Sequence, residues 1–256
     1  MRMHQHAGRL PEEPARRLDG GASVKVIGLL SWYEEPASWL AECVAGLAQL
    51  CDHLVAVDGP YARFPGAVRK PASGSEQADT IARTAAGAGI GCTIHVPRQP
   101  WWGNEVEKRS FMFDLAMTVA EPDVDWLVRV DADEVFTTVP PDTRALLAAT
   151  DRDVAEVTMW ERGVDDGQDS QFPIRVAFRA LPGIRIQQAH YVVTAPRVDG
   201  RTRVLVGNDS VHKQELAEPL WDVRLEHRTR QRPAMRRAAK DQYYAQLPEI
   251  EQVSEL

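Results

Sequence analysis

The stretch that decides the fold is Trp126-Leu127-Val128-Arg129-Val130-Asp131-Ala132-Asp133-Glu134-Val135-Phe136. Its apolar run, interrupted only by Arg129, predicts a buried strand. Three acids follow at the carboxyl end of that strand, where open α/β sheets bind their ligands. On extended chain Asp131 and Asp133 point to the same side and could share one divalent cation. Oxygen ligands without a nearby Cys or His favour Mg²⁺ or Mn²⁺, which often partner phosphates. The alternative is a solvated acidic turn without a ligand. We prefer the cation site because neighbouring carboxylates repel each other unless a cation joins them.

The chain before this stretch alternates strand and helix patterns. Strands are predicted at 24–30, 53–57 and 91–96, and helices at about 34–50, 76–88 and 105–120. A strand, helix and strand in succession implies a right-handed crossover and parallel pairing. The first half therefore predicts an α/β fold with a Rossmann-like, mostly parallel central sheet and helices on both faces.

The second half is less regular and predicts a smaller, mixed C-terminal part. We expect a short helix at 140–150, a strand at 154–160, an acidic loop at 161–170, strands at 174–179 and 184–193, and a helix at 232–246. The expected organisation is a disordered leader (1–22), a first half (23–136), a second half of the same domain (137–247) and a tail (248–256).

Composition narrows the functional classes. A formal net charge of -7 argues against a general nucleic-acid-binding protein, which normally carries a basic surplus. The three cysteines are too few for a disulfide framework, which favours a reducing cytoplasm. No apolar run approaches the length of a membrane span. A local basic run from Arg224 to Lys240, with Glu226 as its single acid, could face phosphate.

Together these features resemble the family 2 glycosyltransferases of the GT-A fold. The resemblance covers 24–136 and continues more loosely to about Tyr244. The matching pieces are the first strand with Glu34, the second strand ending in Asp58-Gly59, the helix with Lys108-Arg109, and Asp131-Ala132-Asp133-Glu134, which matches the DxD motif of the family. The resemblance implies inverting transfer of a sugar from a nucleoside diphosphate donor, with a UDP-sugar favoured, to an acceptor hydroxyl. It also implies Mn²⁺ or Mg²⁺ as the cofactor.

The resemblance also implies residues that contact the donor. Asp58 corresponds to the acid that contacts the base or ribose, although it is also typical of a turn before glycine. Glu34 or Glu35 is expected to line the same pocket, or else to cap the following helix. Lys108 and Arg109 lie near the start of a helix, where cations are unfavourable unless an anion meets them. They are expected to approach the phosphate or the sugar, and the alternative is a solvated helix face.

The expected metal ligands are two acids and a histidine from late in the chain. Asp131 would face the ribose or the metal, and Asp133 would bind the metal that bridges the two phosphates. His227 is the first choice for the additional ligand and His212 the second, since GT-A enzymes often supply a late histidine. Arg228, beside His227, is expected to contact the diphosphate.

An inverting transfer needs a base that takes the proton of the acceptor hydroxyl. In the family this base is an acid after the DxD motif. The candidates are Asp166, which we favour, then Asp165 and Glu161, with Asp169 and His190 as further possibilities. No sharp motif selects one of them.

Two other functions compete with this interpretation. A phosphohydrolase of the haloacid dehalogenase type also places Asp-x-Asp at a strand end, but there the motif lies on the first strand and a small hydroxyl residue follows it. Here three strands precede the motif and Glu134-Val135-Phe136 follows it. The other alternative is a nucleotide-sugar- or glycan-binding module without catalysis.

Overall fold

The computed structural model describes residues 24–101, 105–165, 168–188, 192–197, 199–207, 216–232 and 234–245. The first half alternates strands and helices as predicted, and the second strand has the predicted bounds. The elements are β1 (Val26–Ser31), α1 (Ala37–Leu47), β2 (His53–Val57), α2 (Ser75–Gly87), β3 (Gly91–His95), α3 (Glu105–Met117) and β4 (Trp126–Asp131).

The second half consists mainly of strands. Its elements are β5 (Glu134–Thr138), α4 (Thr143–Ala149), β6 (Val154–Asp165), β7 (Gln168–Arg179), β8 (Arg185–Gln188), β9 (Val192–Pro196), β10 (Thr202–Val206), β11 (Glu218–His227), the short 3₁₀ helix η2 (Thr229–Gln231) and α5 (Ala234–Ala245). Strands from both halves share one eight-stranded sheet, while β8, β9 and β10 form a small separate sheet.

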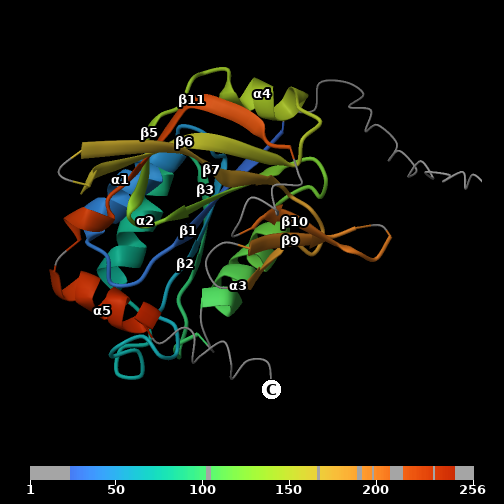
Figure 1. Ribbon diagram of the computed structural model, residues 1–256. Helices are drawn as coiled ribbons and strands as arrows, with labels where there is room; N and C mark the ends of the chain where they lie inside the picture. Colours follow the sequence, from blue (N-terminus) through green and yellow to red (C-terminus); the bar gives the residue numbers. More distant parts are fainter. Residues whose placement is uncertain are drawn as a thin grey trace, which may run out of the picture.

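The order of strands in the large sheet is β3-β2-β1-β4-β7-β6-β11-β5 (Figure 1). The first four strands pair in parallel, as the alternation of strands and helices predicts. Beyond β4 the sheet is mixed, because β4 and β7, β7 and β6, and β11 and β5 are antiparallel, whereas β6 and β11 are parallel. From β1 the chain proceeds outward to β2 and β3 and then returns to β4 on the other side of β1. This reversal of strand order lies between β1 and β4, which is the place where open α/β sheets bind ligands.

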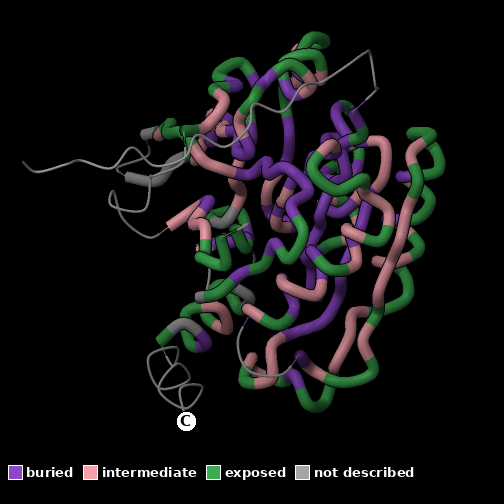
Figure 2. Tube along the Cα trace, turned by 90° about the vertical axis from the view of Figure 1, so that its right-hand side faces the viewer, coloured by how far each residue is buried: buried purple, intermediate pink, exposed green. Residues whose placement is uncertain are grey.

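The central strand β1 is buried on both faces. Val26 and Leu30 pack on one face with residues of α1 and α2. Ile27 and Leu29, at the alternate positions, pack on the other face with α3 and the small sheet. Helices therefore cover both faces, as predicted, and the buried residues concentrate along the central strands (Figure 2).

Two predictions about the second half were wrong, and three strands were missed. The segment 161–170 was expected to be a loop, but β6 and β7 continue through it as a hairpin that pairs as far as Asp165 and Gln168. One strand was expected at 184–193, where the structure has β8 and β9, which pair with each other. The strands β5, β10 and β11 were not predicted. Two of these, β5 and β11, complete the large sheet, so the second half contributes more to the sheet than the sequence indicates.

Arg179 connects the two halves where β7 pairs with β4. Its guanidinium donates to the carbonyl oxygens of Val124, Thr150 and Arg152 and lies over the ring of Trp126. Asp153 lies 3.4 Å from Arg179 Nε. Burial of this guanidinium is tolerated because its charge is paired and its terminal nitrogens donate to carbonyl oxygens.

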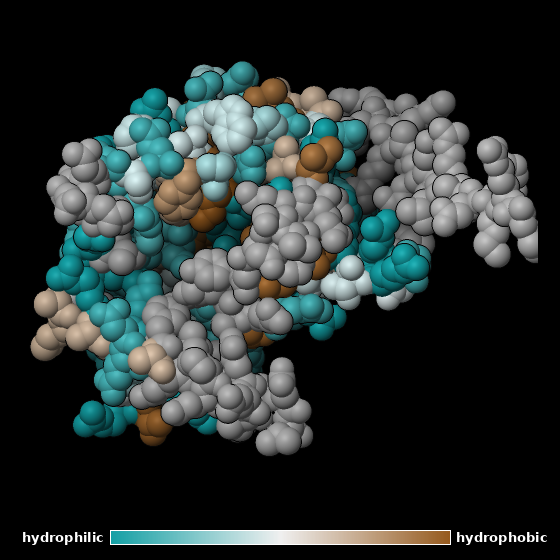
Figure 3. All heavy atoms as spheres, viewed as in Figure 1, coloured by the Kyte–Doolittle hydropathy of each residue, from teal (hydrophilic) through white to brown (hydrophobic). Residues whose placement is uncertain are grey.

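The surface seen in Figure 3 is mostly hydrophilic where it is described, and the hydrophobic residues on it appear singly or in small groups. Such scattered residues are ordinary for a protein surface. Among the described residues, no helix is both long enough and apolar enough to span a bilayer.

Candidate functional site at the reversal of strand order

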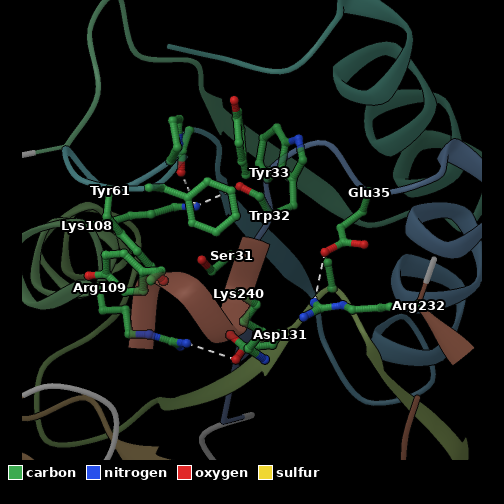
Figure 4. A pocket seen from close by; sticks show the side chains of 15 residues that line it. Ser31, Trp32, Tyr33, Glu35, Tyr61, Lys108, Arg109, Asp131, Arg232 and Lys240 are labelled. Carbon is green, nitrogen blue, oxygen red and sulfur yellow. Dashed lines mark hydrogen bonds and ion pairs between the residues drawn. The ribbon is translucent and has the colours of Figure 1, made fainter. Parts of the chain in front are cut away.

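A pocket opens at the carboxyl ends of β1, β2 and β4 (Figure 4). Its walls come from the segments after β1 and β2, the start of α3, the turn after β4, and the C-terminal segment that contains α5. The lining residues are Ser31, Trp32, Tyr33, Glu35, Gly59, Pro60, Tyr61, Phe64, Lys108, Arg109, Asp131, Ala132, Arg232, Lys240 and Tyr243. The pocket therefore lies at the predicted place, beside the reversal between β1 and β4.

The charged residues of the lining are four cations and two acids. The cations are Lys108, Arg109, Arg232 and Lys240, and the acids are Glu35 and Asp131. In Figure 4, Lys108 and Arg109 lie on one side of the pocket, Arg232 and Glu35 on the other, and Asp131 with Lys240 between them. A recess with more cations than acids favours an anionic ligand.

Lys108 and Arg109 lie in the first two turns of α3, and both line the pocket. Their contact with the phosphate or the sugar stays a prediction. The Lys108 ammonium donates to the carbonyl oxygens of Trp32 (2.7 Å) and Gly59 (2.9 Å), so it ties the segments after β1 and β2 together. Gly59 has a φ of 102°, which glycine adopts without strain. Arg109 is paired with Glu105 (3.2 Å) and Asp131 (2.8 Å). The anions expected near these cations are therefore supplied in part by the protein itself.

The acidic motif does not continue as extended chain. Strand β4 ends at Asp131, and Ala132 and Asp133 form a turn before β5, so the expectation that both acids lie on one face of a strand was wrong. The Glu134 carboxylate accepts a hydrogen bond from the Asp131 backbone N–H, 2.8 Å away, across this turn. Burial, together with the charges of Asp131 and Asp133, raises the pKa of Glu134 to about 7.

Asp131 and Asp133 have different partners. Burial would raise the pKa of the Asp131 carboxyl, but the charge and hydrogen bond of Arg109 hold that pKa well below its usual range. The other carboxylate oxygen of Asp131, Oδ1, is buried and has no hydrogen-bond partner within the described residues. Asp133 is 1 % exposed and does not line the pocket. Its Oδ1 lies 3.0 Å from the guanidinium of Arg232, and its Oδ2 lies 3.3 Å from Nε2 of His227.

His227, predicted from late in the chain to join the acids, lies at the end of β11 between two carboxylates. Its Nε2 faces Asp133, and its Nδ1 is 2.7 Å from Oε1 of Glu161 on β6. Burial alone would lower the pKa of His227, but the hydrogen bond and charge of Asp133, followed by the charges nearby, raise it to about 9. Without another cation at this position, the imidazole is therefore protonated at neutral pH.

Two of these residues, Asp133 and His227, could together bind a divalent cation. Within the described part of the chain, no group of three or more His, Cys, Asp or Glu side chains is placed to hold a metal ion. The closest arrangement is Asp133 with His227, which brings a carboxylate oxygen and an imidazole nitrogen together. Glu161 holds the other ring nitrogen, as carboxylates commonly do behind metal-binding histidines. Mg²⁺ and Mn²⁺ often use few protein ligands and complete their shell with water and phosphate oxygens.

Glu34 and Glu35, both predicted near the donor, have different surroundings. Glu35 lines the pocket, is 2 % exposed, and lies 2.8 Å from the guanidinium of Arg232. Glu34 does not line it. Its carboxylate pairs with Lys70 at 2.5 Å, and its backbone adopts a φ of 53°, which is uncommon for a residue other than glycine.

Asp58 follows β2 and is buried, but it is not part of the pocket lining. Its two oxygens accept hydrogen bonds from the backbone N–H (2.7 Å) and the hydroxyl (2.6 Å) of Ser73. The hydroxyl oxygen of Ser73 also accepts a hydrogen bond from the N–H of Glu34 at 2.8 Å. Burial raises the pKa of Asp58, and the bonds from Ser73 oppose this effect. In the structure Asp58 therefore anchors the segment between β2 and α2.

The remaining predicted residues lie away from the pocket or outside the description. Arg228 is paired with Glu42 and Glu226 and does not line the pocket. Asp169 is paired with Arg162 in the exposed part of the hairpin. Asp165 is the last residue of β6. Three predicted residues lie outside the described residues: Asp166, His190 and His212.

Several lining residues were not singled out from the sequence, and three of them come from the C-terminal segment: Arg232, Lys240 and Tyr243. Arg232 is 8 % exposed and pairs with both Glu35 and Asp133. Tyr243 is buried on α5, and its ring packs against those of Tyr61 (5.2 Å) and Phe64 (6.0 Å). The basic run from Arg224 to Lys240 was the available signal. It indicated the segment, but spacing alone did not separate Arg232 from Arg228.

Comparison with known proteins leaves the family open. No protein-family profile and no curated protein matches the chain. Among solved structures, a candidate glucose-1-phosphate thymidylyltransferase from Bacillus anthracis in complex with sucrose is 12% identical, with a TM-score of 0.31 over 57% of this chain and 56% of that chain. This chain thus spans little more than half of that protein. The 4-diphosphocytidyl-2C-methyl-D-erythritol synthase from Anaerococcus prevotii is 8% identical, with a TM-score of 0.34 over 62% of this chain and 73% of that chain. Both TM-scores are low, so neither structure identifies the activity of this chain.

Proposed function

We propose that this protein is an inverting glycosyltransferase of the GT-A type, which transfers a sugar from a nucleoside diphosphate sugar to an acceptor hydroxyl. The observation that carries the proposal is the pocket at the β1/β4 reversal. Four cations line it, and the acidic turn with His227 adjoins it. The diphosphate of a sugar nucleotide is an anion of the kind that such a pocket favours. A UDP-sugar is the favoured donor.

In this proposal the two sides of the pocket have different tasks. Lys108 holds the segments after β1 and β2 at a fixed distance, so the aromatic side chains Trp32 and Tyr61 present apolar surfaces to the base or the sugar. Arg109 orients Asp131 through their 2.8 Å ion pair. Asp131 lines the pocket with a partly exposed side chain, and its carboxylate can accept a hydrogen bond from a ribose or sugar hydroxyl.

Asp133 and His227 would hold Mn²⁺ or Mg²⁺, with Glu161 orienting the histidine. A bound divalent ion would supply positive charge that stabilises the departing diphosphate. Because Glu161 contacts His227, we assign it to positioning. We keep Asp166 and then Asp165, the last residue of β6, as candidates for the base.

The proposal is tested by a thermal-shift screen of nucleoside diphosphate sugars with and without Mn²⁺, followed by calorimetry and a donor-hydrolysis assay. A bound donor stabilises the native state by mass action. We expect one donor class to raise the melting temperature more with Mn²⁺ than without it, and to release its nucleoside diphosphate slowly in water. Asp133→Asn should abolish the effect of Mn²⁺ on donor binding.

The control is Asp169→Asn, because Asp169 pairs with Arg162 away from the pocket. It should bind the donor as the wild-type protein does. Binding of a sugar nucleotide without any turnover or transfer would support a binding module instead, and hydrolysis of simple phosphomonoesters would support a phosphohydrolase. Absence of binding to every sugar nucleotide would refute the proposal.

A further inference from the structure

We infer that Arg232 is a diphosphate-binding residue which, without a ligand, covers Asp133 and thereby keeps the divalent cation from binding before the donor. The inference rests on the proposed function and extends it from the class of ligand to the order of binding. Arg232 lines the pocket and also contacts Asp133, whereas Asp133 itself does not line the pocket. Arg232 therefore lies between the buried carboxylate and the space where a ligand would bind.

The contacts of Arg232 show how its charge is balanced. One guanidinium nitrogen lies 2.8 Å from Oε1 of Glu35, at the start of α1, and 3.0 Å from Oδ1 of Asp133, after β4. Both carboxylates are at most 2 % exposed. A buried guanidinium needs such anionic partners, since desolvation of an unpaired charge is costly. Arg232 can therefore leave Asp133 readily only if another anion replaces that carboxylate.

A divalent cation at Asp133 would compete with Arg232. The ion at Oδ2 would displace the proton of His227 and would bring one more positive charge beside the guanidinium at Oδ1 than the free protein holds there. The divalent ion and the guanidinium, held at the two oxygens of one buried carboxylate, repel each other unless an anion lies between them. The diphosphate of the donor is such an anion, and a guanidinium binds phosphate oxygens with two parallel hydrogen bonds. The cation and the diphosphate are thus expected to bind together.

The chain around Arg232 supports this exchange. Arg232 lies between η2 and α5, and the same C-terminal segment brings Lys240 and Tyr243 to the pocket. The side chain of Tyr243 packs on Tyr61 in the segment after β2. A diphosphate that draws Arg232 inward would also meet a second cation, Lys240, from the adjoining helix α5.

The experiment measures two affinities by calorimetry for the wild-type protein, Arg232→Ala and Arg232→Lys. The first is the affinity for Mn²⁺ alone. The second is the affinity for a nucleoside diphosphate without metal, using whichever of UDP, GDP, ADP, CDP and dTDP binds the wild-type protein best with Mn²⁺. For Arg232→Ala we expect Mn²⁺ alone to bind about tenfold tighter and the diphosphate about tenfold weaker, which is the size of one charge-assisted contact.

The expected changes in affinity have opposite signs, tighter for Mn²⁺ and weaker for the diphosphate, and a purely structural role of Arg232 would not produce this pattern. If Arg232 only supported the fold, its removal would weaken both affinities together. Arg232→Lys keeps the charge but loses the two-pronged geometry, so it should change both affinities in the same directions by less. It also serves as the second variant if Arg232→Ala does not fold. Arg237→Ala is the matched control, because Arg237 is an exposed arginine on α5 whose guanidinium donates to the Arg230 carbonyl oxygen.

Unchanged or weaker binding of Mn²⁺ in the arginine variants would overturn the inference, and so would unchanged binding of the diphosphate. These outcomes leave the proposed function standing if the wild-type protein binds a nucleoside diphosphate with Mn²⁺. If the wild-type protein binds none of the five, the proposed function itself fails.

Discussion

The two sides of the acidic turn differ in how their charges are balanced. Before the turn, Asp131 ends a parallel strand and is paired with Arg109, only 22 residues earlier in the chain. After the turn, Asp133 is paired with His227 and Arg232, which come from the far end of the second half. Two acids separated by one alanine are thus neutralised by residues from different halves of the chain.

This difference shows that a DxD-like motif need not act as one unit before a ligand binds. Asp131 is partly exposed in the pocket, with its side chain 31% accessible, whereas Asp133 is buried. The first half therefore presents a carboxylate that is ready for a ligand, while the second half keeps its carboxylate covered. The predictions below test this asymmetry, from the largest expected effect to the smallest.

The largest effect is expected for Asp133→Ala. Its removal takes away two charge-assisted contacts at once, from His227 and Arg232, which keep Glu161 and Glu35. At about 1.5–3 kcal/mol for each such contact, the cost is about 3–5 kcal/mol. Asp131→Ala should cost about 1 kcal/mol, because Arg109 retains Glu105 and the site is partly exposed. Urea unfolding of both variants, with a chelator present, measures the two costs. Equal losses in the free energy of unfolding would show that Asp131 and Asp133 do not differ in how their charges are balanced.

An intermediate loss of stability is expected when the hydrogen bonds between Asp58 and Ser73, which anchor the segment between β2 and α2, are removed. Asp58→Ala should lower the free energy of unfolding by about 2 kcal/mol, since two hydrogen bonds from Ser73 are lost. Ser73→Ala should cost about 1 kcal/mol, and the double variant should cost less than the sum, because both changes remove one interaction.

Urea unfolding combined with limited proteolysis between β2 and α2 provides the measurement for this pair. Faster cleavage in both variants would support the anchoring role of Asp58. Full stability of Asp58→Ala, accompanied by loss of donor binding, would instead support the direct donor contact predicted from the resemblance.

The smallest effect concerns histidines of the first half. Burial, with the charge of Lys25, lowers the pKa of His53, and burial lowers that of His95. Between these lowered values and the ordinary value of about 6.5, the unfolded chain binds more protons than the folded one. Stability from these residues is therefore complete above about pH 6.5 and falls as the pH drops through that window.

The measurement for these histidines is the free energy of unfolding between pH 7 and pH 5, for the wild-type protein and for His53→Gln with His95→Gln. The double variant should show a smaller fall. If the free energy of unfolding falls equally with pH in both proteins, other titratable groups cause the loss of stability below pH 7.

The sequence predicted much of the first half because its signals are local. The segment His53–Val57 is a short apolar strand between a helix and Asp58-Gly59, and the structure has the same bounds. In contrast, β11 was missed because its apolar residues do not alternate regularly. Leu220, Val223 and Leu225 are buried, but the pairing with β6 shifts register between Leu220 and Arg224. A bulge of this kind hides the period of two on which strand prediction depends.

By itself the sequence determined the parallel pairing of β1 to β4 and the place of the pocket at the ends of these strands. It also pointed to Lys108, Arg109 and Asp131, which the structure places in the pocket wall. These follow from hydrophobic periodicity and from the rule that parallel crossovers bring strand ends to one edge. Only the tertiary structure decided that Asp133 is buried and that Arg232, not Arg228, lines the pocket beside it. The physical reason is that burial and ion pairing depend on which distant side chains lie together in space. His227 at the end of β11 and Arg232 before α5 reach Asp133 from about a hundred residues away along the chain.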